Sequence, residues 1–156
     1  MSNLTPPTAE HIRKLMSWFN SEPELREWAG PVFDYPFDAQ SFTNDLKLDT
    51  LDSFSMLNRQ GELLAFGQCY ERVGRWHLGR LAVSPKHRGQ GLVQNLIEYL
   101  SDFGFEQHGI STNSLFVLEG NASAIKAYEK CGFALAKYPD IMPMQTTYYM
   151  IRKMTS

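Results

Sequence analysis

The hydrophobic positions near the N-terminus recur at the spacing of an amphipathic helix, which predicts a helix over residues 8–19 with Thr8 as its N-cap. The apolar positions of this stripe are Ile12, Leu15, Met16 and Phe19. A shorter helix is predicted over residues 22–28, and a loop rich in Gly, Pro and aromatic residues follows it. Asp38 is a suitable N-cap for a third helix that ends near residue 48.

The middle of the chain has the pattern of strands joined by tight turns. Residues 54–58, 63–72 and 76–83 are short and apolar, and turn residues at Gln60-Gly61 and Gly74 separate them. Because these segments follow one another so closely, we expect them to form an antiparallel meander.

Helices and strands alternate in the second half. A helix is predicted from Gly91 to Gly109, because one apolar stripe continues through it. The stripe consists of Leu92, Val93, Leu96, Ile97, Leu100 and Phe103. A strand over residues 114–118, a helix from Asn121 to Gly132 and a hairpin of residues 134–138 and 146–153 complete the pattern.

This order of elements predicts an α/β (α+β) protein, in which helices that connect strands give some parallel pairing. We expect a single mixed, mostly antiparallel sheet of six to seven strands with helices on both faces. No Pro/Gly/Ser-rich linker divides the chain, so residues 1–156 are predicted to form one domain.

Composition excludes several function classes. With 15 Lys and Arg against 17 Asp and Glu, the chain has no general attraction for nucleic acid, and it has no apolar run of membrane-spanning length. Cys69 and Cys131 lack the spacing of metal ligands, and no secretory signal is visible. We therefore expect a cytoplasmic protein that uses no metal and binds neither nucleic acid nor membrane.

The clearest chemical signal is the loop between the third strand and the long helix. Arg88, Gly89 and Gly91 precede a helix start, whose free backbone N–H groups and positive dipole end attract anions. Glycines let a phosphate approach the backbone closely. A plain strand-to-helix turn is the alternative interpretation.

Residues 78–100 resemble motif A of the GNAT acyltransferase superfamily. The motif [Q/R]-x-x-G-x-[G/A] corresponds to Arg88-Gly89-Gln90-Gly91-Leu92-Val93, after Leu81-Ala82-Val83-Ser84-Pro85. Val93 stands where the family usually has a small residue. A second family element, N-x-x-A-x-x-x-Y-x-x-x-G-F, follows in register; its residues are Asn121, Ala124, Tyr128, Gly132 and Phe133.

The resemblance implies that acetyl-CoA binds as co-substrate in a gap between two splayed parallel strands. The backbone of Leu81, Ala82 and Val83 would hold the pantetheine arm, and Asn121 would lie beside it. Backbone amides along the motif would hold the pyrophosphate; these belong to Arg88, Gly89, Gln90, Gly91, Leu92 and Val93.

The same resemblance implies direct attack of an amine on the thioester. Tyr128 would be the general acid for the leaving thiolate, and His77 is the candidate base. Strand alternation is expected to place His77, Gly79 and Leu81 on one face. Glu71, Glu119 and ordered water are alternative bases.

The aromatic residues, 13% of the chain, concentrate near two predicted loops. Trp28, Phe33 and Tyr35 lie among carboxylates in residues 22–37, a composition that suits a cationic amine. We take these three residues and Glu71 as candidate acceptor contacts, with residues 138–149 as an opposite wall and 139–145 as a lid. Packing of the same rings into the core is an equal alternative.

The predicted function is acetyl transfer from acetyl-CoA to a primary amine of a small molecule or a protein. The alternative is an acyl-CoA-binding regulatory module on the same fold without efficient turnover. The oligomeric state stays open, with a homodimer as one candidate.

Overall fold

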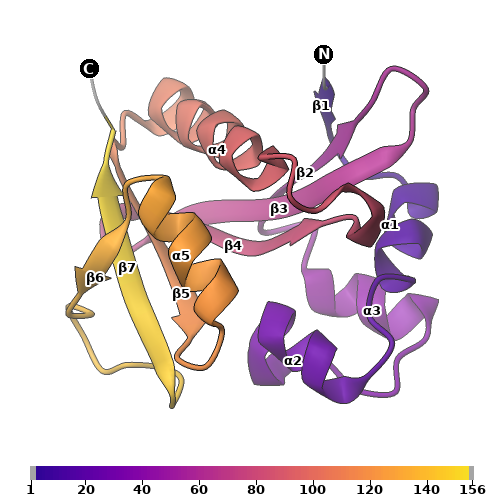
Figure 1. Cartoon of the computed structure of the whole chain (residues 1–156), viewed down its shortest axis with the longest axis horizontal. Helices are drawn as coiled ribbons and strands as arrows, with labels where there is room; N and C mark the ends of the chain where they lie inside the picture. The colour runs from indigo at the N-terminus through magenta and orange to yellow at the C-terminus, as the bar shows by residue number, and fades with distance from the viewer. Residues whose placement is uncertain (1–2, 155–156) are drawn as a thin grey trace.

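One seven-stranded sheet organises the protein (Figure 1). The computed structural model describes residues 3–154, and the strand order is β1-β2-β3-β4-β5-β7-β6. The strands are β1 (Asn3–Thr5), β2 (Asp52–Leu57), β3 (Leu63–Arg72), β4 (Arg75–Val83), β5 (Thr112–Leu118), β6 (Ala134–Ala136) and β7 (Thr147–Lys153). Among the strands of residues 3–154, only the β4–β5 pair is parallel, so the predicted mixed, mostly antiparallel sheet is confirmed.

Helices cover both faces of this sheet, as the sequence predicted. They are α1 (Ala9–Met16), α2 (Glu22–Ala29), α3 (Ala39–Leu46), α4 (Leu92–His108) and α5 (Ala122–Lys130), with 3-10 turns at Gly30–Val32 and Pro85–His87. One core packs α4 and α5 against β2 to β7, and a second core packs α1 to α3 against the opposite face (Figure 1).

Several predicted boundaries move by a few residues. Helix α1 ends at Met16, three residues before the predicted end, because the N–H groups of Trp18 and Phe19 bond to carbonyls three residues back instead of four. Asp38 caps α3 as predicted, with its Oδ1 accepting the Ser41 N–H at 2.8 Å. Strand β1 was not predicted, because three residues carry no period and gain their pairing from β2.

The prediction that His77, Gly79 and Leu81 share one face of β4 is wrong. Phe66 pairs with Ala82 but Gln68 pairs with Gly79, so two residues of β4, Arg80 and Leu81, stand opposite one residue of β3. This is a β-bulge, and Arg80 has a left-handed φ of 50° within it. Leu81 therefore joins the core under α4, and Arg80 turns to the face that carries His77.

The parallel pair separates soon after it forms. Strands β4 and β5 pair only at Trp76↔Asn113 and His77↔Ser114, although β4 continues to Val83 and β5 to Leu118. Within residues 3–154 no later pair closes this gap, so backbone groups of both strands face an opening rather than each other. The sheet is thus split along its centre, and the candidate site is built around the split.

Candidate active site

The glycine-rich loop and the split strands border one large cavity of about 900 Å³, which we call the loop cavity. Its walls are the end of β4, the loop and helix start at His87 to Gln94, and the inner side of α5. The structure brings together in this wall all the residues predicted to bind the co-substrate except Gln90. They are Leu81, Ala82, Val83, Arg88, Gly89, Gly91, Leu92, Val93 and Asn121.

Two glycines give the loop its shape. Gly89 and Gly91 have φ values of 81° and 74°, a conformation that residues with a Cβ adopt only at a cost. Gly91 is the N-cap residue of α4, so the first N–H groups of a 17-residue helix point into the loop cavity region. A Cβ built on either glycine meets nothing within 4 Å, so open space lies beside this backbone, and the loop fits a phosphate group.

Helix α5 contributes the predicted asparagine and tyrosine. Asn121 is its N-cap residue, with Oδ1 accepting the Ala124 N–H at 3.3 Å, so this side chain also has a structural role. Tyr128 lies about two turns further along the helix, against the core and on the wall of the loop cavity. Burial raises the pKa of Tyr128 to about 12, so its hydroxyl is protonated at neutral pH.

A second, smaller cavity of about 350 Å³ lies on the other side of β4. We call it the arginine cavity, because Arg26, Arg72 and Arg80 line it; His77, Gln68 and Tyr70 complete its inner wall. The two cavities meet at the split between β4 and β5, because they share seven wall residues. These are Glu27, Trp28, Leu78, Gly79, Arg80, Phe116 and Val117.

His77 lies in the arginine cavity wall but is only 2% exposed. Its Nδ1 lies 2.9 Å from Ser114 Oγ on β5, at the last paired position before the strands separate. Burial, with a smaller contribution from the charge of Arg72, lowers the pKa of His77 to about 3. The imidazole is therefore neutral at neutral pH, as the ordinary histidine pKa of about 6.5 no longer applies to this buried side chain.

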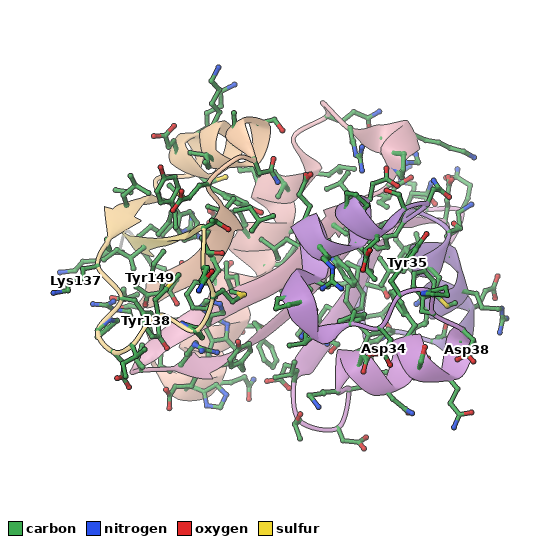
Figure 2. All side chains as sticks on the ribbon, turned by 90° about the horizontal axis from the view of Figure 1, so that it is seen from below. Asp34, Tyr35, Asp38, Lys137, Tyr138 and Tyr149 are labelled. Carbon is green, nitrogen blue, oxygen red and sulfur yellow. The ribbon has the colours of Figure 1, made fainter. Side chains whose placement is uncertain are left out.

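The predicted acceptor contacts are not brought together. Phe33 is 2% exposed inside an aromatic cluster with Phe42 and Trp28, so the core alternative holds for this ring. Trp28 lines both cavities with its remaining surface. Tyr35 donates to the Asn20 carbonyl at 3.4 Å, lines neither cavity, and lies far from Tyr138 and Tyr149 in Figure 2.

The carboxylates named as alternative bases also lie outside both cavities. Glu71 is exposed near the end of β3, where its Oε2 accepts the Gly74 N–H of the following turn at 3.0 Å. Glu119 is exposed at the end of β5, where its N–H donates to the Thr146 carbonyl. Neither is a wall residue of the loop cavity or the arginine cavity.

The residues that sequence reasoning missed are Gln68, Arg72 and Arg80. They were overlooked because β3 is predominantly apolar, and its polar residues were not assigned to a site. One signal was present: Gln68, Tyr70 and Arg72 alternate along β3, which places three polar side chains on one face of a buried strand. The orientation of the Arg80 side chain depends on the β-bulge, and no local sequence pattern marks that bulge.

In this α/β protein, two parallel strands separate beside a glycine-rich loop at the start of a helix. Such an arrangement can hold an extended anionic ligand between the separated strands. The chain belongs to the Acetyltransferase (GNAT) family, whose family model matches residues 12–133. The resemblance stated from the two motifs is therefore confirmed.

Known relatives include two curated acetyltransferases. The [ribosomal protein bS18]-alanine N-acetyltransferase of Escherichia coli (strain K12) is 36% identical over 77 residues, which cover 49% of this chain and 51% of that protein. The mycothiol acetyltransferase of Salinispora tropica is 30% identical over 125 residues, covering 74% of this chain and 38% of that protein. The chain thus spans about half the length of these relatives or less.

Solved structures show the same fold over nearly the whole chain. The ribosomal-protein-S18-alanine N-acetyltransferase from Escherichia coli matches with a TM-score of 0.67 at 21% identity, covering 100% of this chain and 96% of its own. Spermidine N-acetyltransferase from Vibrio cholerae, solved with CoA and spermine, matches with a TM-score of 0.73 at 17% identity, covering 97% and 95%.

Two features of residues 3–154 bear on other function classes. No helix in this part of the chain combines the length and the apolar character needed to cross a membrane. No group of three or more His, Cys, Asp or Glu residues in the same range is arranged to hold a metal ion.

Proposed function

We propose that this protein transfers the acetyl group of acetyl-CoA to a primary amine. The observation that carries the proposal is the loop cavity, in which the Gly89–Gly91 helix start, the unpaired end of β4 and Tyr128 line one continuous wall. Acetyl-CoA, when bound, supplies a thioester carbonyl as the electrophile. The remaining steps belong to residues of this chain.

Binding uses backbone groups more than side chains. The N–H groups of residues 88–93 hold the pyrophosphate at the positive end of α4, and Arg88 adds a cation at the cavity wall. The β4 backbone from Leu81 to Val83, which has no partner on β5, pairs with the amides of the pantetheine arm. Val93 packs its side chain against the core under α4 and still offers its N–H.

Proton transfer to the leaving thiolate is the role proposed for Tyr128. Its hydroxyl lies on the loop cavity wall, and its raised pKa keeps a proton available at every pH near neutrality. A tyrosine held in this way donates to a sulfur that becomes basic only as the thioester bond breaks.

His77 has a changed role in this proposal. An imidazole with a pKa of about 3 is a weak base, so we propose that the amine loses its proton to water at the cavity mouth. His77 then acts as a neutral side chain that shapes the arginine cavity and is oriented by Ser114.

The arginine cavity is proposed as the acceptor site, because it meets the loop cavity at the strand split. Its volume of about 350 Å³ fits a small amine or the first residue of a peptide. Met144 lies near Gly30, and Pro143 and Met144 line this cavity, which supports the proposal that residues 139–145 form a lid. A homodimer and a cytoplasmic location stay predictions.

The test is release of free thiol from acetyl-CoA, measured with a panel of primary amines against an amine-free control. Amine-dependent thiol release with an acetylated product identified by mass spectrometry supports acetyl transfer. Tight CoA binding in calorimetry without thiol release across the panel would instead support the alternative, an acyl-CoA-binding module.

A further inference from the structure

We infer that the acceptor amine carries an anionic group, a carboxylate or a phosphate, which Arg72 and Arg80 bind in the arginine cavity. This inference rests on the proposed function and specifies its substrate class. It comes from a group of polar side chains on β3 and β4 that the proposed transfer chemistry does not itself require.

Arg80 is held in place by a buried amide. Its Nη1 donates to Gln68 Oε1 at 2.8 Å, and Gln68 is 0% exposed. The amide nitrogen of Gln68 is itself bound to the Leu46 carbonyl at 2.7 Å and to Ser53 Oγ at 2.8 Å. With both ends of the amide engaged, Gln68 is a positioning residue that orients the Arg80 guanidinium before any ligand arrives.

Arg72 is held by two tyrosine hydroxyls. Its Nε donates to Tyr138 Oη at 2.9 Å and its Nη1 to Tyr70 Oη at 3.1 Å. The guanidinium also lies 5.2 Å from the centre of the Phe116 ring. These contacts fix the direction of the side chain but are all with neutral groups.

The positive charge of this pair is not balanced by a carboxylate. Among residues 3–154, neither Arg72 nor Arg80 forms an ion pair, whereas Arg26 pairs with Glu22 and Arg152 with Glu98. Asp45 attracts Arg80 only through space, and its Oδ2 accepts the Asp34 N–H. Partly buried cations cost free energy unless an anion or a strong acceptor compensates them, so this cavity favours an anionic ligand.

Two unused hydrogen-bond donors support the same ligand class. The Nε–H of Arg80 and the Nε1–H of Trp28 are buried and have no partner within the described part of the chain. Both side chains line the arginine cavity. Donors without acceptors are satisfied by a ligand that brings oxygen atoms, and a guanidinium is suited to the paired oxygens of a carboxylate or phosphate.

The phosphates of CoA at the glycine-rich loop do not account for Arg72, although Arg80 and Trp28 line the loop cavity as well as the arginine cavity. Arg72, Gln68 and Tyr70 line the arginine cavity alone, whereas the glycine-rich loop lines the loop cavity alone. The cationic acceptor expected from residues 22–37 is also disfavoured, because among their carboxylates only Glu27 reaches the arginine cavity. Glu27 is exposed and lines the loop cavity as well.

The experiment compares amines that differ by one anionic group. L-Phenylalanine is paired with phenethylamine, and phosphoethanolamine with ethanolamine, with spermidine as the cationic arm; thiol release gives kcat/KM for each. In the pair that matches the true substrate class, kcat/KM for the anionic amine is expected to exceed kcat/KM for its neutral partner by about tenfold. This factor corresponds to one charge-assisted hydrogen bond. The two pairs distinguish carboxylate from phosphate.

We expect the ratio of kcat/KM for the anionic member to kcat/KM for its neutral partner to fall to near one in Arg72→Met and in Arg80→Met. The ratio should fall less in Arg72→Lys. Arg59→Met, an exposed arginine in the β2–β3 turn that lines neither cavity, is the matched control and should leave the ratio unchanged. Melting temperatures of all variants report folding. A higher KM for acetyl-CoA in Arg80→Met, with the ratio unchanged, would assign Arg80 to the co-substrate and overturn its acceptor role.

Binding keeps the inference testable without turnover. Calorimetry on the protein saturated with CoA compares N-acetyl-L-phenylalanine with N-acetyl-phenethylamine, and N-acetyl-phosphoethanolamine with N-acetyl-ethanolamine. Tighter binding of an anionic member, lost in Arg72→Met, supports the inference even where no thiol is released and the proposed function fails. Acetyl transfer that is equal for neutral and anionic amines, or best for spermidine, would overturn the inference and leave the proposed function standing.

Discussion

Tyr128 combines burial with access to the loop cavity. Its ring packs edge-on against Phe133, with centroids 6.2 Å apart, and its hydroxyl has no hydrogen-bond partner among residues 3–154. Because burial raises the pKa of Tyr128 to about 12, the hydroxyl keeps its proton at neutral pH and can donate it to a thiolate as the thioester bond breaks.

Tyr128→Phe removes this proton with little change in volume. We expect kcat to fall by about 100-fold, the usual lower range for a lost general acid, while the KM for acetyl-CoA changes little. Steady-state thiol release measures both constants. A variant with the kcat of the parent protein would exclude the acid role.

Burial of the His77 side chain makes the free energy of unfolding depend on pH in the acidic range. Its pKa is about 3 in the folded protein and near 6.5 when exposed, so unfolding binds a proton between these values. The free energy of unfolding therefore decreases as the pH falls below about 6.5. The decrease is about 1.4 kcal/mol per pH unit over the range in which His77 is protonated only in the unfolded chain.

His77→Gln is expected to remove this contribution, so its unfolding free energy should decline less steeply between pH 6 and pH 4. Urea denaturation at a series of pH values measures the slope. His108→Gln, at an exposed histidine, is the control and should keep the slope of the parent protein. The same steep decline in both variants would show that His77 does not carry the effect.

At the scale of elements, the contact between α4 and β4 sets where the split begins. Gly104 of α4 lies against the ring of Trp76, whose Nε1–H donates to the Leu100 carbonyl at 2.9 Å. Trp76 is 1% exposed and precedes His77, the last β4 residue that pairs with β5. This close packing holds the paired start of the two strands.

Gly104→Ala tests that contact. Alanine in place of a mid-helix glycine ordinarily stabilises a helix by about 1 kcal/mol. Here the added Cβ would overlap the Trp76 ring, so we expect a loss of about 1–3 kcal/mol instead. Chemical denaturation gives the value, with Phe105→Ala on the exposed side of α4 as control. A stabilised Gly104→Ala variant would contradict the packing.

At the scale of the whole molecule, the proposed CoA site lies at the split between the two halves of the sheet. CoA that binds only the folded chain stabilises it by about 2.7 kcal/mol at a hundredfold excess over Kd, which corresponds to a rise in Tm of roughly 5–10 °C. Thermal denaturation with and without CoA measures the shift. Gly91→Trp, which fills the loop, should reduce it relative to its own ligand-free Tm, and an undiminished shift would place CoA elsewhere.

Much of the fold could be predicted because its signals are local. Helix α4 follows an uninterrupted apolar stripe between two glycines with positive φ, and β3 was predicted with the bounds that the structure has. That the loop and α5 would form one cavity wall could be predicted for the same reason, since each carries a compact motif.

The acceptor side depended on tertiary structure. The sequence alone determined the order of elements, the phosphate-type loop and the candidate acid Tyr128. The bulge that turns Arg80 away from Leu81, the burial that lowers the pKa of His77, and the pairing of Arg72 with Tyr138 across 66 residues were decided only on folding. Local patterns encode helices and turns, whereas burial and charge balance depend on which distant segments meet.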